Sequence, residues 1–207
     1  SHLGLKIIYS VLNARDDTLA ERVYAPWVDM EALMREKHIP LYTLESKCPV
    51  KDFDVLGFTM PFEMCYTNIL NMLDLSGIPL LARDRSDEDP LVVSGGPCVY
   101  NAEPVADFFD VFFIGESEEA IGEMADIVKA WKKEGKPGGR REIIRRMASI
   151  KGCYAPSLYK VSYYENGVFR SIAPTDEAAQ FPVEKRLIPD FDKVKVDDKP
   201  ILPHIEI

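Results

Sequence analysis

The chain lacks the sequence features that nucleic-acid-binding, membrane and secreted proteins require. It carries 25 lysines and arginines against 34 aspartates and glutamates, a formal net charge of −9. It therefore lacks the basic footprint of a nucleic-acid-binding surface. It also has no apolar run near the ~18 residues that span a membrane, and no signal-peptide pattern opens it. We expect neither nucleic acid nor a membrane as a partner, and we expect a cytoplasmic protein.

Cysteine and histidine are sparse. The four cysteines are far apart and show no paired spacing of the kind that zinc and iron–sulfur sites use, and the three histidines are scattered. The sequence predicts four reduced thiols and no metal site. With 207 residues, of which 46% are hydrophobic and 29% charged, the chain has ordinary globular composition and can bury a substantial core.

Three apolar runs, residues 54–60, 91–94 and 111–114, stop at small or polar residues, and a helical pattern follows each. This alternation predicts a mainly parallel sheet with crossover helices. The expected helices cover residues 2–14, 28–38, 63–75, 103–109, 118–134 and 140–150, and a short strand is expected at 22–25. The pair Asn166-Gly167 predicts a hairpin between strands at 159–165 and 168–172.

The break at Gly135-Lys-Pro-Gly-Gly139 suggests a division of the chain. We predict an α/β domain at residues 1–137. Residues 138–207 then form a helix, a β-hairpin and an extended linker. The arginines at 140, 141, 145 and 146 favour a solvated basic face, with a phosphate or partner contact as the minority interpretation. The charge run at 83–89 predicts a solvated loop.

Ligands of parallel sheets bind where strands end, so the loops there hold the candidate site. The consecutive glycines could let a ligand approach the backbone, or could simply form a tight turn. Glu118 and Glu119, at the start of the helix expected at 118–134, would repel phosphate, so a hydroxyl- or amide-bearing ligand fits better. Ser117 could also serve only as a helix cap. The candidate residues are Thr59, Ser94, Gly95, Gly96, Gly115, Glu116 and Ser117.

Several longer motifs run in one order along the chain: Arg22-Val-Tyr-Ala-Pro-Trp-Val-Asp-Met-Glu-Ala-Leu33, Gly95-Gly-Pro-Cys98, Asn101-Ala-Glu-Pro104 and Gly115-Glu-Ser-Glu-Glu119. With these motifs the chain resembles the amino-terminal, cobalamin-binding-like domain of a family of radical S-adenosylmethionine (SAM) proteins. The resemblance implies a flavodoxin-like (Rossmann-like), doubly wound, mainly parallel sheet whose first strand is missing here. It also implies a following radical SAM barrel, in the same polypeptide, that holds a [4Fe–4S] cluster and S-adenosylmethionine.

This resemblance implies that the chain by itself is not catalytic and that the downstream radical SAM domain is its partner. A homodimer is the other partner that it allows. The histidine motif D-x-H-x-x-G of some cobalamin domains is absent, so cobalamin would bind without a protein histidine on cobalt, through Thr59, Gly95, Gly96 and Ser117. The alternative is a degenerate structural or interaction domain that binds no cobalamin.

The missing first strand has a physical consequence. In the flavodoxin-like order this strand is central, so its absence would leave unpaired edges. We expect the chain to fill the gap with another segment, to dimerise, or to be only marginally stable.

Overall fold

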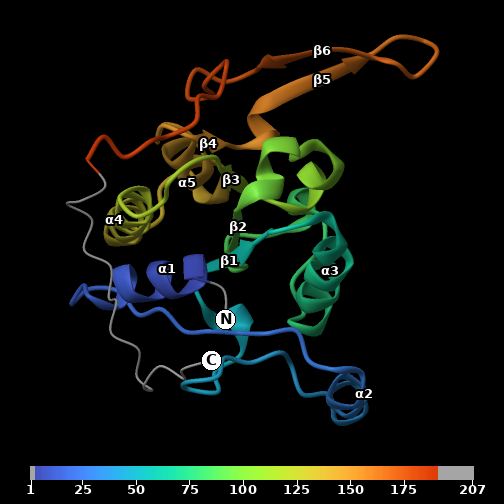
Figure 1. The fold of residues 1–207 in the computed structure, drawn as a ribbon, viewed down its shortest axis with the longest axis vertical. Coiled ribbons are helices and arrows are strands. Elements are labelled where there is room, and N and C mark those ends of the chain that lie inside the picture. The colour runs from blue at the N-terminus through green and yellow to red at the C-terminus, as the bar shows by residue number, and fades with distance from the viewer. Residues whose placement is uncertain (1–2, 191–207) are drawn as a thin grey trace, which may run out of the picture.

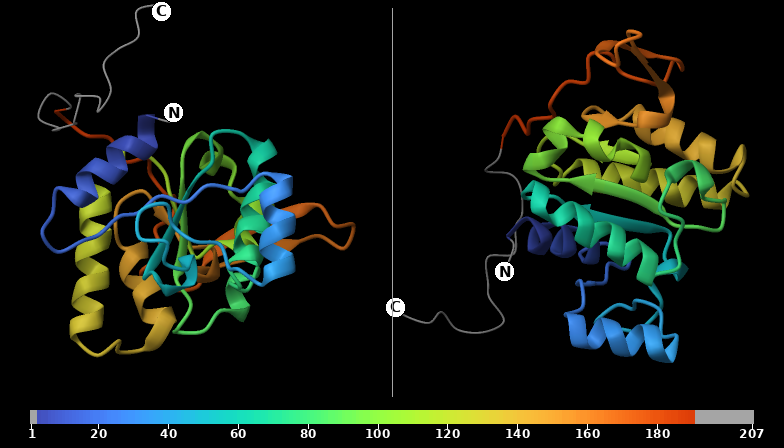
Figure 2. Two further views of the ribbon diagram at one scale, coloured as in Figure 1. Left: turned by 90° about the horizontal axis from the view of Figure 1, so that it is seen from below. Right: turned by 90° about the vertical axis from the view of Figure 1, so that its right-hand side faces the viewer.

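The computed structural model describes residues 3–190, and its core is a four-stranded sheet with helices on both faces (Figures 1 and 2). The strand order is β1 (Val55–Thr59), β2 (Leu91–Gly95), β3 (Val111–Phe113) and β4 (Cys153–Tyr154). The first three strands are parallel and β4 is antiparallel to β3. The predicted α/β class with a mainly parallel sheet is therefore confirmed.

The helices are α1 (Leu3–Asn13), α2 (Val28–Lys37), α3 (Tyr66–Leu75), α4 (Ala120–Lys133) and α5 (Gly139–Ala148). Short 3-10 helices lie at Val50–Asp52, Glu63–Cys65, Ala82–Asp84, Pro97–Asn101, Glu103–Phe108 and Pro156–Leu158. The helices expected at 2–14 and 28–38 and the three long ones after them are thus present, with shifted ends. The piece expected at 103–109 is a 3-10 helix.

Alternating side chains of the strands divide the core into two layers. Leu56, Phe58, Val92 and Phe112 pack on the side of α3. Leu91, Val93, Val111 and Phe113 pack against α4 and α5 on the opposite face. Both faces are covered, which explains why these strands read as continuous apolar runs in the sequence.

The predicted carboxyl-terminal appendage has one part that packs into the core and one part that projects from it. Helix α5 buries Ile143 and Met147 completely in the layer that it shares with α4. The hairpin of β5 (Tyr159–Tyr163) and β6 (Phe169–Pro174) forms a separate two-stranded sheet that projects from the body (Figure 1). The hairpin prediction is confirmed, and the domain division after residue 137 stays a prediction.

The prediction of a strand at residues 22–25 is wrong, because the structure has no strand there. A strand needs a neighbour with which to exchange backbone hydrogen bonds. The N–H of Arg22 instead donates to the Glu45 carboxylate, and its carbonyl accepts from the N–H of Leu44. Among residues 3–190 no strand pairs with the outer edge of β1, so no described strand fills the expected gap.

Within the described range, no helix is long and apolar enough to cross a membrane. The four cysteines form no disulfide in the structure, in line with the predicted reduced thiols. Nor do residues 3–190 contain a group of three or more His, Cys, Asp or Glu side chains placed to hold a metal ion.

Candidate functional site

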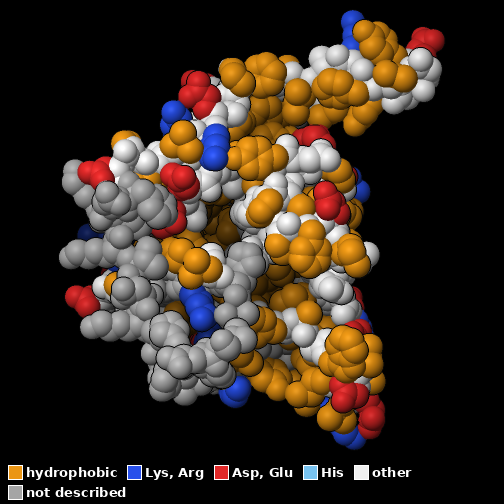
Figure 3. All heavy atoms as spheres, in the orientation of Figure 1, with side chains coloured by type: hydrophobic (Ala, Val, Ile, Leu, Met, Phe, Trp, Pro, Cys, Tyr) orange, Lys and Arg blue, Asp and Glu red, His pale blue; other side chains and the backbone are white. Residues whose placement is uncertain are grey.

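The carboxyl ends of β1, β2 and β3 meet at one face of the molecule, onto which Figure 3 looks. That face is hollowed near its centre and flanked by hydrophobic side chains (Figure 3). The loops after β1 and β2 expose Phe62, Met64 and Tyr100. Apolar walls of this kind suit a flat organic ligand better than a free phosphate.

The loop after β1 is fastened to the loop after β2 through Met60. Its N–H donates to the carbonyl of Gly95 over 2.8 Å, and its carbonyl accepts from the N–H of Cys98 over 3.0 Å. Gly96 has a φ of +111°, and a Cβ there would lie 2.9 Å from the Met60 carbonyl oxygen. Glycine at 96 is therefore required by this contact between two loops of the protein itself.

Ser94 and Gly95 are also engaged internally. The Ser94 side chain is buried, and its Oγ donates to the carbonyl of Phe58 over 3.1 Å. A Cβ at Gly95 would be 3.9 Å from the Phe113 carbonyl oxygen, which is ordinary contact. The hydroxyl of Ser94 therefore stabilises the pairing of β1 with β2 and does not face a ligand.

The third loop is covered by a later part of the chain, residues 184–188, which we call the closing segment. Arg186 donates its N–H to the Ile114 carbonyl, and its own carbonyl accepts from the N–H of Glu116, both over 3.0 Å. Gly115 has a φ of +134°, and a Cβ on it would lie 2.2 Å from the Arg186 carbonyl oxygen. The Glu116 carboxylate accepts a 2.6 Å hydrogen bond from the N–H of Ile188. Gly115 and Glu116 are thus used to hold this segment.

The Arg186 side chain anchors the closing segment on α4. Its guanidinium donates to Glu123 over 2.6 and 2.8 Å and to Glu119 over 3.1 Å. The hydrogen bonds that Arg186 donates to Glu123 and, to a lesser extent, to Glu119 raise the pKa of Arg186, and the same contact with Arg186 lowers the pKa of Glu123. This ion pair closes one flank of the site.

Ser117 does not cap the helix through its hydroxyl, contrary to the sequence-based interpretation. Helix α4 begins at Ala120 with no side-chain cap, and the Ser117 carbonyl accepts from the N–H of Ile121 over 2.9 Å. In the described part of the chain, neither Thr59 nor Ser117 uses its side-chain hydroxyl in a hydrogen bond to the protein. These two hydroxyls remain free for a ligand.

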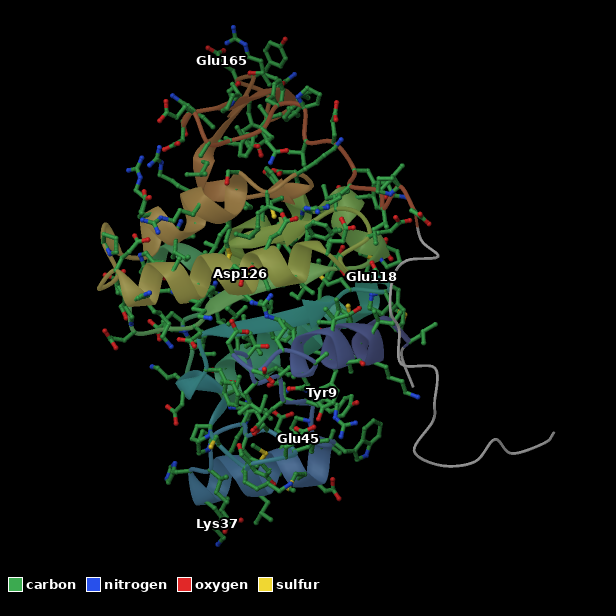
Figure 4. All side chains as sticks on the ribbon, turned by 90° about the vertical axis from the view of Figure 1, so that its left-hand side faces the viewer. Tyr9, Lys37, Glu45, Glu118, Asp126 and Glu165 are labelled. Atoms are coloured by element: carbon green, nitrogen blue, oxygen red, sulfur yellow. The ribbon has the colours of Figure 1, made fainter. Side chains whose placement is uncertain are left out.

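Glu118 is the residue at this edge that the sequence prediction missed. It lies at the carboxyl-edge end of α4 (Figure 4), and its Oε2 is buried without a hydrogen-bond partner among the described residues. A buried carboxylate oxygen without a donor is unfavourable. In the sequence Glu118 begins the helix expected at 118–134, where the helix dipole alone explains a carboxylate, and nothing in the pattern indicates that its oxygen is buried.

The Cys98 thiol and the Tyr66 hydroxyl lie in the segments that follow β2 and β1. Burial raises the pKa of Cys98, and the Glu63 carboxylate nearby adds to this. Burial also raises the pKa of Tyr66, whose hydroxyl makes a hydrogen bond with the Cys98 thiol. These groups are therefore neutral at pH 7, and the face keeps its apolar character.

Comparison with known proteins gives two matches. Residues 4–156 match a family model described as "Radical SAM proteins, N-terminal". An uncharacterized protein of Methanocaldococcus jannaschii is 35% identical over 86 residues, which are 41% of this chain and 18% of that protein. No solved structure matches. The chain therefore covers less than a fifth of the relative's length, and the matched family segment includes all three loops of the candidate site.

Proposed function

Because the chain belongs to the family of radical SAM N-terminal domains, we propose that it is the module of a larger radical SAM protein that holds a cobalamin at the carboxyl edge of its sheet. In this proposal the chain binds and orients the cofactor and performs no radical step itself. The sheet order would be the flavodoxin-like one. The [4Fe–4S] cluster and S-adenosylmethionine would belong to the following domain, which is the module's main partner.

The observation that carries the proposal is the buried, unpartnered Oε2 of Glu118 at the carboxyl-edge end of α4. A corrinoid offers a broad apolar ring and peripheral amides whose N–H groups can donate to a carboxylate. A hydrogen bond from such an amide would satisfy Glu118 and remove its desolvation penalty. Thr59 and Ser117 have free hydroxyls for further amide contacts. When bound, cobalamin would supply an alkyl- or methyl-carrying cobalt.

The other predicted contacts fit a ligand less well. Ser94, Gly96, Gly115 and Glu116 all bond or pack against the protein itself. Of the three histidines, only His38 lies in the described range, where it ends α2. Cobalamin would therefore bind in the hollow without any described histidine on cobalt.

A second function is favoured by the closing segment. It occupies the Gly115 loop, and this contact would be needed equally by a module that binds no cofactor. In that case the carboxyl-edge face would be an apolar docking surface for the following domain or for a second copy in a homodimer. A cytoplasmic location remains part of either proposal.

A visible-absorbance titration of the chain with hydroxocobalamin and methylcobalamin tests the proposal. We expect a saturable spectral shift, and roughly tenfold or more weaker binding by Glu118→Gln, since a hydrogen bond to a charged group contributes about 1.5–3 kcal/mol. Glu119→Gln is the matched control, because Arg186 keeps its two bonds to Glu123. An unchanged spectrum, with circular dichroism showing a folded protein, would support the structural module instead.

A further inference from the structure

Two of the four cysteines, Cys65 and Cys98, lie in the segments that follow β1 and β2, where the carboxyl ends of these strands meet. Met60 joins the two segments, because its N–H donates to the Gly95 carbonyl and its own carbonyl accepts from the N–H of Cys98. Both cysteine side chains are partly buried and pack against the same hydrophobic layer, the one on the side of α3. The fold therefore brings together two thiols that are distant in sequence.

Tyr66, the residue after Cys65, connects the two thiols. Its hydroxyl donates a hydrogen bond to the Cys98 sulfur. Burial is the main cause of the raised pKa of Cys98, and the charges of Glu63 and Cys65 raise it further. Burial also raises the pKa of Tyr66 most, and the charges of these same neighbours add to the rise. The two thiols, the phenol and the carboxylate thus form one cluster.

The segment that carries Cys65 is free to adjust. Cys65 ends the short 3-10 helix Glu63–Cys65, and its thiol donates to the Phe62 carbonyl over 2.9 Å. No residue of this helix is buried, and Met64 is 84% exposed. A segment without buried side chains can shift at a small cost in free energy. Such a shift can bring the Cys65 sulfur within bonding distance of the Cys98 sulfur.

The other two cysteines are not part of this cluster. Cys48 is exposed in the loop before β1, and Cys153 is buried in β4, where burial raises its pKa to about 12. Neither of them is among the groups that act on Cys98 or Tyr66. Among the cysteines, all of which the described range includes, Cys65 and Cys98 are therefore the pair suited to react with each other.

We propose that Cys65 and Cys98 form a reversible thiol–disulfide centre that responds to hydroperoxides. The two thiols are reduced in the structure, and oxidation would join them. The new bond would fix the loop after β1 and the start of α3 to the loop after β2. This inference requires no bound cofactor, so it stands or falls independently of cobalamin binding.

The chemistry uses two successive displacements. Cys65 reacts first, because the raised pKa of Cys98 keeps that thiol protonated. The Cys65 sulfur, after giving up its proton, attacks one oxygen of hydrogen peroxide, and the O–O bond breaks. The other oxygen leaves as hydroxide, takes up that proton and becomes water, and a sulfenic acid remains on Cys65.

Cys98 then closes the disulfide. Its sulfur attacks the sulfenic sulfur of Cys65, the S–O bond breaks, and the leaving hydroxide takes the Cys98 proton to form a second water. The hydrogen bond from Tyr66 stabilises the negative charge on the Cys98 sulfur during this attack. In total the two thiols lose two electrons, and one peroxide gains them. Reduction by glutathione or another thiol restores both groups.

Treatment of the purified chain with hydrogen peroxide tests the proposal. The Cys48→Ser variant is used, so that the exposed thiol cannot join two molecules. The number of thiols titrated after unfolding should fall from three, which is four cysteines minus Cys48, to one, which is Cys153. Mass spectrometry of a tryptic digest should find the peptides with Cys65 and Cys98 linked, and dithiothreitol should separate them.

Three further variants in the same background resolve the steps, with circular dichroism showing that each is folded. Cys98→Ser should stop at a sulfenic acid on Cys65 that dimedone labels. Cys65→Ser should leave Cys98 reduced under the same treatment. Tyr66→Phe should slow disulfide formation roughly three- to tenfold, the effect of one lost hydrogen bond. When it is combined with Cys98→Ser, it should leave sulfenic acid formation on Cys65 unchanged.

Two results would overturn the proposal. One is a treated, folded protein in which Cys65 and Cys98 both remain reduced or a different pair is linked. The other is a sulfinic acid on Cys65 with Cys98 still reduced, since the two sulfurs would then be too far apart to react with each other.

Discussion

Arg140 donates a hydrogen bond from Nη2 to Oδ2 of Asp110 over 2.7 Å, and the Asp110 side chain is only 1% exposed. Arg85, whose side chain is fully buried, donates to the same oxygen over 3.0 Å. Burial lowers the pKa of Arg85, and the charge of Asp110 opposes this. The carboxylate also accepts from the N–H of Val92. One aspartate at the start of β3 therefore joins the 79–90 loop, β2 and α5.

Replacing Asp110 with asparagine should destabilise the protein strongly. The change leaves two buried guanidinium groups without their counter-charge, and breaking a buried pair in this way costs about 3–5 kcal/mol. The free energy of unfolding in urea measures the effect. Asp126→Asn is the control, since Asp126 pairs with Arg15 on the surface and should change stability by about 0.5 kcal/mol or less. Equal effects of the two changes would contradict the structural role of Asp110.

Replacing Gly115 with alanine should release the closing segment from the sheet. The new Cβ would collide with the Arg186 backbone, so the segment must move. Trypsin should then cut faster after Lys185 and Arg186, and the melting temperature should fall. Gly135→Ala is the matched control, because Gly135 has a φ of +84° and no atom near its Cβ position, so only the backbone strain of about 1–2 kcal/mol applies. Unchanged trypsin cutting in Gly115→Ala would argue against the contact.

The buried thiol of Cys153 should react last of the four cysteines. Burial raises its pKa to about 12, whereas Cys48 is exposed. A disulfide reagent at pH 8 should therefore label Cys48 quickly and Cys153 only after unfolding. Rapid labelling of Cys153 in the folded protein would show that the residue is not buried as described.

The same thiol should make stability fall at alkaline pH. The folded state holds the proton that the unfolded chain loses above about pH 9, so stability is complete below pH 9 and declines between pH 9 and 12. At pH 10.5 the loss should be about 2 kcal/mol. Cys153→Ala, compared with the unchanged protein in urea at pH 8 and 10.5, should remove this part of the decline. An identical decline in both proteins would refute the assignment.

The ion pair between Glu123 and Arg186 should contribute stability that acid removes. Arg186 holds the pKa of Glu123 below its ordinary value of 4.5. The contribution is therefore present above pH 4.5 and is lost as the pH falls through the lower, folded-state pKa. Glu123→Gln should lower the urea midpoint at pH 7, and lower it by a smaller amount at pH 3. Glu165→Gln, at the hairpin tip (Figure 4), is the exposed control and should have no effect at either pH.

Local patterns in the sequence were sufficient for most of the sheet and its helices. Continuous apolar runs predicted β1, β2 and β3 because both faces of these strands are covered. The two-residue strand β4 was missed, since Cys153–Tyr154 is too short to show any periodicity and its pairing with β3 depends on the fold. The strand expected at 22–25 does not form. A strand needs a partner strand, and the local sequence cannot show whether one lies beside it.

Charged residues were the least predictable part. Arg85 lies in a run that reads as a solvated loop, and Arg140 belongs to a helix face that reads as exposed and basic. Both side chains are instead buried around Asp110. The neighbouring sequence does not indicate that these arginines are buried, because their partner Asp110 is distant along the chain. The candidate loops were placed at the correct edge, but contacts with Met60 and Arg186 decide which of their residues remain free for a ligand.

The closing segment is translated after the part of the sheet that it covers. Glu116 and Ile188 are 72 residues apart in sequence, yet they form one hydrogen bond. A ribosome adds about 5–20 residues per second, so β3 and its loop emerge several seconds before Ile188 does. Until residues 184–188 emerge, the nascent chain lacks the segment that covers the loop after β3. Completion of that face therefore waits until the closing segment has been translated.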